Sequence, residues 1–215
     1  VYGKQGKYGE AINYFQKALD QKPDYSPAHY NIARAYHLVG KKQEAAESYR
    51  KAIKFNPYFE KAFYNLAYLS LELSGFDEAI ENFNKFIKMQ PNHSRAHFGL
   101  GNALMMKGQL DLAMLEYRIS GKLDSTFALP YMNMASIQIQ TKNISAAIEN
   151  YEKALKINPN LPAIHLNLGM IYYQFMNNAP KALGYLKETL RLNPDQQGAS
   201  RLKSLIVELE NKKPA

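Results

Sequence analysis

Hydrophobic and small side chains recur along the chain with a period of 34 residues. In one period the first apolar set lies at i, i+3, i+4 and i+7, the spacing of one face of a helix; it comprises His29, Ile32, Ala33 and Tyr36. The second apolar set comprises Ala45, Tyr49, Ala52 and Ile53. Each period therefore predicts two helices, and a fixed period of this length predicts a solenoid of stacked helix pairs.

Five complete periods and one partial period divide the chain into residues 1–25, 26–59, 60–93, 94–127, 128–161 and 162–196. Residues 1–25 form a truncated half repeat, which we expect to expose apolar surface and so to allow self-association. Residues 197–215 leave the frame and predict an amphipathic capping helix followed by a tail. The apolar face of that helix comprises Ala199, Leu202, Leu205, Ile206 and Leu209.

Small residues recur where two helices must approach within about 8–10 Å of each other. They are Ala33, Ala67, Gly101, Ala135 and Gly169, and the large residues of the second helices are Tyr49, Phe83, Tyr117 and Tyr151. Gly40 predicts a left-handed cap after a first helix, and Asn-Pro pairs such as Asn56-Pro57 end second helices. Ser125 replaces this proline in residues 94–127, so we expect a looser helix end there. One extra residue near Asn177 predicts a different turn, with Pro180 in the first turn of the next helix.

This order of large, small and proline positions resembles the tetratricopeptide repeat (TPR) family over residues 1–196. The resemblance implies an all-α fold, a right-handed superhelix or α-solenoid of helix-turn-helix repeats. It also implies that the first helices line a concave groove that binds a peptide segment or a partner helix. The groove positions of the family motif fall here on residues of every first helix, among them Leu166, Met170 and Tyr173. The candidate binding residues chosen from them are Tyr30, Asn31, Arg34, Lys61, Tyr64, Asn65, Tyr68, Arg95, Phe98, Asn102, Asn133 and Asn167.

Asparagine recurs at one groove position, in a row interrupted only by Gly99 and comprising Asn31, Asn65, Asn133 and Asn167. An amide both donates and accepts hydrogen bonds, so such a row suits a peptide backbone. It resembles the asparagine ladder in the repeat domain of O-linked N-acetylglucosamine transferases. Hydrogen bonding to neighbouring helices is the alternative, and both roles stay open. The clamp that binds chaperone C-termini in related adaptors is matched only in part, because Tyr30 and Gly99 replace two of its polar members.

The net charge of +8 invites a nucleic-acid partner, but the distribution of charge argues against one. Nine of the 27 basic residues occupy two repeat positions near predicted helix C-termini, where cations oppose the helix dipole. They are Lys17, Lys51, Lys85, Lys153, Lys54, Lys88, Lys122, Lys156 and Arg191. We therefore expect a protein or peptide partner and no nucleic acid.

The sequence offers no set of residues for catalysis, and we expect no metal and no cofactor. Cysteine is absent, and Gly99-x-Gly101 lies in a helical repeat rather than after a strand. His29, His97 and His165 are two repeats apart, which is about 20 Å at common helix spacings, whereas zinc holds its ligands at roughly 2 Å. The longest apolar stretches, such as residues 66–71, are far shorter than the roughly 20 residues of a membrane helix.

These patterns favour a non-enzymatic protein–protein interaction scaffold. The alternative is that the chain is the substrate- or partner-binding TPR region of a larger enzyme, such as a membrane-bound or O-GlcNAc-type glycosyltransferase. The half repeat and the start at Val1 rather than methionine keep that alternative open. The residues do not indicate a compartment.

Overall fold

The computed structural model describes residues 7–195 and 197–211, and these ranges contain helices and no strand. The chain divides into two compact units, Val1–Leu123 (unit 1) and Asp124–Ala215 (unit 2). The predicted all-α solenoid is confirmed, because helices adjacent in sequence pack against each other within each unit.

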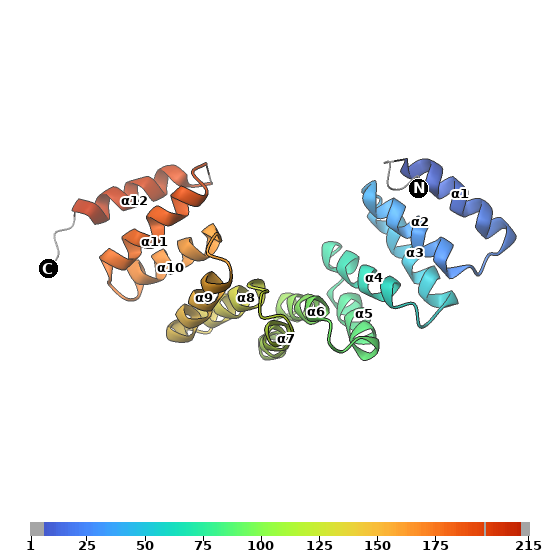
Figure 1. Ribbon diagram of the computed structural model, residues 1–215, viewed down its shortest axis with the longest axis horizontal. Coiled ribbons are helices and arrows are strands. Elements are labelled where there is room, and N and C mark those ends of the chain that lie inside the picture. The colour runs from blue at the N-terminus through green and yellow to red at the C-terminus, as the bar shows by residue number, and fades with distance from the viewer. Residues whose placement is uncertain (1–6, 196, 212–215) are drawn as a thin grey trace. The chain divides into compact units, whose positions relative to one another are not determined.

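The described part of unit 1 contains the helices α1 (Tyr8–Gln21), α2 (Ser26–Leu38), α3 (Lys42–Phe55), α4 (Glu60–Glu72), α5 (Phe76–Met89), α6 (Ser94–Met106) and α7 (Leu110–Leu123). The most extensive contacts join α2 to α3, α4 to α5 and α6 to α7. Within this unit α4 and α6 lie on one side, and α5 and α7 lie on the other (Figure 1). The first helices of consecutive repeats therefore share a face.

The described part of unit 2 contains α8 (Leu129–Gln140), α9 (Ile144–Ile157), α10 (Pro162–Gln174), α11 (Ala179–Leu192) and α12 (Ala199–Asn211). The helix pairs α8–α9 and α10–α11 pack as in unit 1, and α12 packs against α11 (Figure 1). The capping helix predicted from the sequence is thus present. It buries Leu202, Ile206 and Leu209, three of the five residues of its predicted apolar face.

The core consists of the recurring small and large residues. Ala33, Ala67 and Ala135 have no exposed surface, and neither have Tyr117 and Tyr151. The need for a small residue is direct at Gly101, where an added Cβ would lie 2.6 Å from Cε1 of Tyr117. Cores of this density do not accept an extra methyl group without movement of their neighbours.

Each first helix is joined to its second helix through one residue in the left-handed region. The φ angles are +80° at Gly40, +59° at Ser74, +75° at Gly108, +62° at Lys142 and +43° at Asn177. The predicted cap at Gly40 is therefore confirmed, although the same turn forms without glycine in three repeats. In the last repeat Asn178 accepts a hydrogen bond from the backbone N–H of Lys181 at 3.1 Å, and Pro180 lies in the first turn of α11 as predicted.

The looser end expected for α7 is not found. The helix ends at Leu123, the repeat position at which α3 ends at Phe55. The Asp124 carboxylate accepts hydrogen bonds from the backbone N–H of Thr126 at 3.0 Å and from its hydroxyl at 2.6 Å. Asn56 makes the same turn through the backbone N–H of Tyr58 at 3.0 Å. The prediction was wrong because this side-chain turn ends the helix and the proline is not required.

Candidate functional site

The twelve predicted groove residues lie on the first helices of their repeats, and each is at least partly exposed. In unit 1, α2 carries Tyr30, Asn31 and Arg34, α4 carries Lys61, Tyr64, Asn65 and Tyr68, and α6 carries Arg95, Phe98 and Asn102. In unit 2, α8 carries Asn133 and α10 carries Asn167. The structure therefore brings ten of the twelve residues to one face of unit 1.

Four of these residues line one pocket of about 270 Å³, which we call the inner pocket. Its lining comprises Tyr30, Glu60, Lys61, Tyr64, Asn65, Phe86, Gln90 and His93. Residues from α2, α4 and α5 contribute, together with His93 just before α6. The pocket is therefore built between consecutive repeats rather than within one repeat.

Aromatic rings form the wall of the inner pocket. The ring centroids of Tyr64, Phe86 and His93 lie 5.0 Å from one another in each of the three pairs. Tyr30 packs on Phe59 at 4.9 Å and on Tyr49 at 5.8 Å. Rings at these distances hold one another in place. Burial lowers the pKa of His93, so this ring is neutral at neutral pH.

Two tyrosine hydroxyls and one amide fix the pocket at α4. Asn65 Nδ2 donates to the hydroxyl oxygen of Tyr30 at 2.9 Å, and the Asn65 side chain also interacts with the Tyr49 hydroxyl. Burial, and secondarily the neighbouring Tyr30, raises the pKa of Tyr49, so its hydroxyl stays neutral. These contacts join α2, α3 and α4, and they position Tyr30 at the pocket.

The asparagine row does not form one uniform ladder. Asn167 Nδ2 donates to the Tyr151 hydroxyl at 2.9 Å, which repeats the contact of Asn65 with a tyrosine of the preceding helix. Asn31 has Phe15 at the corresponding preceding position, and its Nδ2 donates instead to the backbone oxygen of Pro27 in its own helix at 2.9 Å. The amides of Asn65 and Asn167 therefore hold neighbouring helices together. This is the role that was the alternative to binding a peptide backbone.

The interruption of the row at Gly99 has a steric cause. At the repeat position of Tyr49 the chain has Phe83, which carries no hydroxyl for an asparagine to bond. A Cβ at Gly99 would lie 2.3 Å from Cζ of Phe83, so the ring occupies the space of a side chain. In this repeat phenylalanine therefore replaces tyrosine where glycine replaces asparagine, and the two replacements are coupled.

Cations flank the aromatic pocket. Lys61 lines it and is exposed, and the Arg34 guanidinium lies 5.9 Å from the ring centroid of Tyr30. The carboxylate of Glu60 accepts a hydrogen bond from Gln90 at 3.0 Å. Further along α4, the Glu72 carboxylate lies 2.9 Å from the Lys42 ammonium, which lowers the pKa of Glu72.

The predicted residues at the α6 end are held by contacts within the unit. The Tyr68 hydroxyl donates to the backbone oxygen of Arg95 at 2.7 Å, and burial raises the pKa of Tyr68. The Tyr117 hydroxyl donates to Oδ1 of Asn102 at 2.7 Å, and Phe98 packs on the Tyr117 ring at 5.7 Å. These side chains therefore form an ordered surface beside the pocket.

Unit 2 has a separate pocket of about 490 Å³ between α10 and α12. Its lining combines apolar side chains, among them Leu166, Met170 and Leu205, with polar and charged ones such as Arg201 and Glu208. Asn133 and Asn167 do not line this pocket. The sequence predicted α12 only as a cover for the last repeat.

The sequence reading missed four lining residues of the inner pocket: Glu60, Phe86, Gln90 and His93. Phe86 lies on a second helix, and the groove positions were taken from first helices only. The repeat position of Phe86 could have indicated a lining role, because its helix α5 packs on the following α6. Gln90 and His93 lie in the turn between repeats, where length and polarity alone do not indicate a lining role.

No helix of residues 7–195 and 197–211 is long and apolar enough to cross a membrane. The same residues contain no group of three or more His, Asp or Glu side chains that could hold a metal ion.

The paired helices, the small residues between them and the shared face of the first helices define a helical-repeat scaffold. The chain belongs to the tetratricopeptide repeat family: a family model described as tetratricopeptide repeat matches residues 1–58 and 64–120, more than half of the chain. A second model, described as TPR repeat, matches residues 136–174. None of the curated proteins matches the chain.

Solved structures of other repeat proteins have the same fold. PilF of Pseudomonas aeruginosa is 18% identical, with 95% of this chain and 92% of that chain covered at a TM-score of 0.76. YrrB, described as a TPR protein with an unusual peptide-binding site, is 19% identical, with coverages of 88% and 97% and a TM-score of 0.69. MamA of Desulfovibrio magneticus RS-1 is 18% identical, with coverages of 74% and 89% and a TM-score of 0.70. At these identities the likeness shows the fold alone.

Proposed function

We propose that the protein is a non-enzymatic interaction scaffold that binds a peptide segment or a partner helix on the face formed by α2, α4 and α6. One apolar side chain of the partner enters the inner pocket. The observation that carries this proposal is the convergence of Tyr30, Lys61, Tyr64 and Asn65 in that pocket. The family motif selects these four residues without any reference to the geometry.

The size and lining of the pocket favour a side chain over a small molecule. Ligand pockets for drug-sized molecules span about 300–1,000 Å³ and enclose most of the ligand, whereas this one has about 270 Å³ and opens on a repeat face. Aromatic rings in fixed positions supply contact area at a low entropy cost. A single leucine-sized or aromatic anchor residue fits this description.

The charges favour an acidic residue beside the anchor. Lys61 is exposed at the pocket, and Arg34 lies over Tyr30 on the same face. Asn31, Tyr68, Arg95, Phe98 and Asn102 extend this face, and we propose them as secondary contacts. Asn133 and Asn167 lie in unit 2. There they contact a second, independent stretch of the partner.

A selection of displayed random peptides on the whole chain tests the proposal. The enriched peptide is then titrated against Tyr64→Ala, Lys61→Ala and the matched controls Tyr58→Ala and Lys88→Ala. Tyr58 is 81% exposed and Lys88 is exposed, and neither lines the inner pocket. Removing a buried aromatic contact at an interface costs about 1–2 kcal/mol, so Tyr64→Ala should weaken binding roughly tenfold.

Lys61→Ala should weaken binding of the same peptide less, and the loss should shrink in high salt because the charge is exposed. Enriched peptides should contain an apolar residue next to an acidic one. Equal affinity of the Tyr64→Ala and Tyr58→Ala variants for the peptide would refute the inner pocket as the site.

A further inference from the structure

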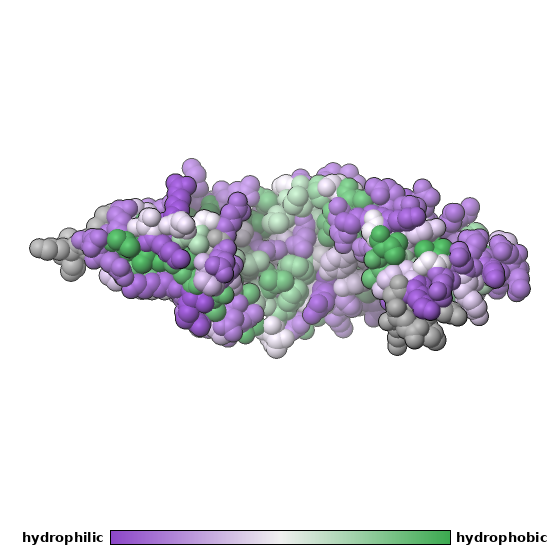
Figure 2. Space-filling model, turned by 90° about the horizontal axis from the view of Figure 1, so that it is seen from above, coloured by the Kyte–Doolittle hydropathy of each residue, from purple (hydrophilic) through white to green (hydrophobic). Residues whose placement is uncertain are grey.

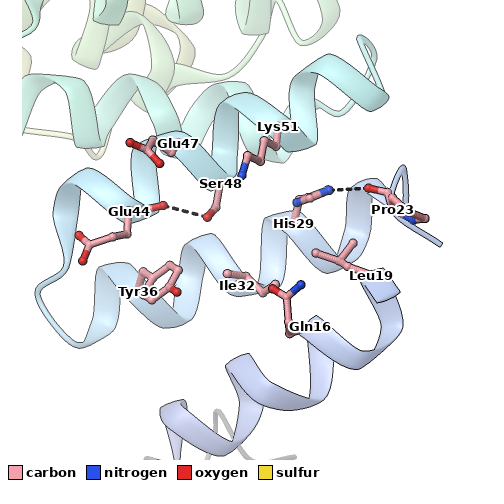
Figure 3. A pocket seen from close by; sticks show the side chains of 10 residues that line it. All are labelled: Gln16, Leu19, Pro23, His29, Ile32, Tyr36, Glu44, Glu47, Ser48 and Lys51. Carbon is pink, nitrogen blue, oxygen red and sulfur yellow. Dashed lines mark hydrogen bonds between the residues drawn. The ribbon is translucent and has the colours of Figure 1, made fainter. Parts of the chain in front are cut away.

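A second pocket, which we call the outer pocket, lies between α1, α2 and α3 and has a volume of about 330 Å³. Figure 3 shows its side chains coming from all three helices. From α2 it uses His29, Ile32 and Tyr36. The inner face of α2 carries Tyr30 and Arg34 instead, and neither of these lines the outer pocket. The outer pocket is therefore a site separate from the proposed groove.

His29 lines this pocket, and one of its two ring nitrogens is already hydrogen-bonded. Its Nε2 lies 2.9 Å from the backbone oxygen of Pro23, and a carbonyl oxygen only accepts, so Nε2 carries the proton (Figure 3). The ring also stacks on Phe55 with centroids 5.2 Å apart, which fixes its orientation. His29 is only 8% exposed. In the neutral ring Nδ1 is therefore a fixed acceptor, and within the described residues it has no hydrogen-bond partner.

The repeat at residues 94–127 shows what the same position looks like when it is filled. His97 Nε2 lies 2.9 Å from the backbone oxygen of Pro91, as at His29, but Nδ1 lies 2.7 Å from the carboxylate of Glu116. Ser48 occupies the repeat position of Glu116, and its short side chain donates to the backbone oxygen of Glu44 at 2.8 Å. The space that the Glu116 side chain fills beside His97 is thus open beside His29.

The charges at the outer pocket oppose those of the whole chain. Glu44 and Glu47 line it from α3, and both are exposed. Within residues 7–195 and 197–211 neither forms a short ion pair, although Glu47 interacts electrostatically with the neighbouring Arg50. Lys51 is the one cation in the lining. Two carboxylates against one ammonium make the rim acidic in a chain whose net charge is +8.

We infer that the outer pocket binds an arginine side chain of a partner protein. The hydrocarbon part lies against Leu19 and Ile32, and the guanidinium donates to Nδ1 of His29. The carboxylates of Glu44 and Glu47 at the rim attract its positive charge. Arginine suits this site because its head carries a permanent positive charge and presents N–H donors to an acceptor nitrogen. This interaction is independent of peptide binding at the inner pocket.

Nuclear magnetic resonance of the whole chain tests this inference with N-acetyl-arginine-methylamide as the probe. N-acetyl-citrulline-methylamide is the control, because it keeps the shape and loses the charge. The arginine compound should shift the His29 ring nitrogens and the Ser48 amide saturably. Citrulline should bind at least fivefold more weakly, since it cannot pair with the two carboxylates.

Two variants separate the pocket from general electrostatics. Glu44→Gln/Glu47→Gln should weaken arginine binding at least fivefold, while Asp111→Asn/Glu149→Gln, which removes the same charge elsewhere, should leave it unchanged. Ser48→Gln places a neutral amide beside His29 and should block the pocket in a chain that still folds. Equal binding of citrulline, or arginine binding that survives both the double glutamine variant and Ser48→Gln, would overturn the inference.

Discussion

Single residues decide which repeats expose polar groups and which use them to join helices. Asn65 and Asn167 bond tyrosine hydroxyls on preceding helices, at 2.9 Å in the contacts to Tyr30 and Tyr151. Asn31 bonds only within its own helix and stays at the surface. Among these three equivalent asparagines, Asn31 therefore has the side chain that can reach a ligand without breaking a contact between helices.

Substituting Gly99 should show how tightly the α5–α6 contact is packed. In Gly99→Ala the new Cβ would meet the Phe83 ring at 2.3 to 3.0 Å. Overpacking costs roughly 1–3 kcal/mol, and a helical alanine regains only about 1 kcal/mol over glycine. Because three ring atoms are involved, we expect a net loss of about 2 kcal/mol, measured by urea denaturation.

Gly184→Ala is the matched control, since no atom lies within 4 Å of a Cβ added to this glycine of α11. It should stabilise the chain by about 0.5–1 kcal/mol through helix propensity alone. If Gly99→Ala gains as much stability as Gly184→Ala, the steric reason for the interrupted asparagine row is wrong.

The His97–Glu116 pair should make stability depend on pH. The hydrogen bond to the Glu116 carboxylate, aided by the Pro91 carbonyl, raises the pKa of His97 above its ordinary value. Its contribution is therefore fully present below the unfolded pKa of about 6.5 and is lost as the pH rises through the raised pKa of the folded chain. Glu116→Gln should remove most of this dependence.

The measurement is the urea midpoint of both chains at about pH 5.5 and about pH 8.5, on either side of the ordinary histidine pKa. The original chain should lose more stability between the two than Glu116→Gln does. The two chains must be compared with each other, because burial also lowers the pKa of His93. That lowered pKa changes stability with pH in the opposite direction, and it does so in both chains. Identical pH dependence of the two chains would contradict an ionised pair.

The family resemblance predicted positions that lie on the first helices, and helical spacing explains why those of unit 1 share a face. It could not predict which of them converge in a pocket. The outer pocket depends on Ser48 being short where Glu116 is long, and on how His29 is held by Pro23. Such spaces follow from three-dimensional packing between repeats, which a pattern of apolar positions does not describe.

At the scale of helices, the pattern predicted the main features and erred where side-chain turns compete with proline. The apolar periods locate the helix pairs because the buried stripes repeat with the helical period. The end of α7 differed from its expectation because Asp124 makes the turn that Asn56 makes elsewhere. A reading that counted Asp and Asn at this position, rather than proline, would have predicted it.

Hydrogen bonds between helices of adjacent repeats further stabilise unit 1. The Arg50 guanidinium donates two hydrogen bonds to the Glu78 carboxylate, at 2.7 and 2.9 Å, and the Ser70 hydroxyl donates to the same group at 2.8 Å. These bonds join α3, α4 and α5 and lower the pKa of Glu78. Two-pronged contacts of this kind hold helices in a defined orientation.

At the scale of the molecule, function is expected from the surface of each unit rather than from a catalytic centre. On the face seen in Figure 2, hydrophobic residues lie in patches between hydrophilic ones. Ten of the twelve predicted groove residues lie in unit 1, and so do the inner and outer pockets. Unit 1 is therefore where partner binding is best sought.

Site-specific cross-linking tests the central claim, binding on the inner face of unit 1. A benzophenone amino acid replaces Lys61 at the inner pocket in one chain and Lys88 on α5 in another, and each is irradiated with the enriched peptide. We expect a cross-linked product from position 61 and none from position 88. Cross-linking from position 88 alone, or equally from both positions, would contradict it.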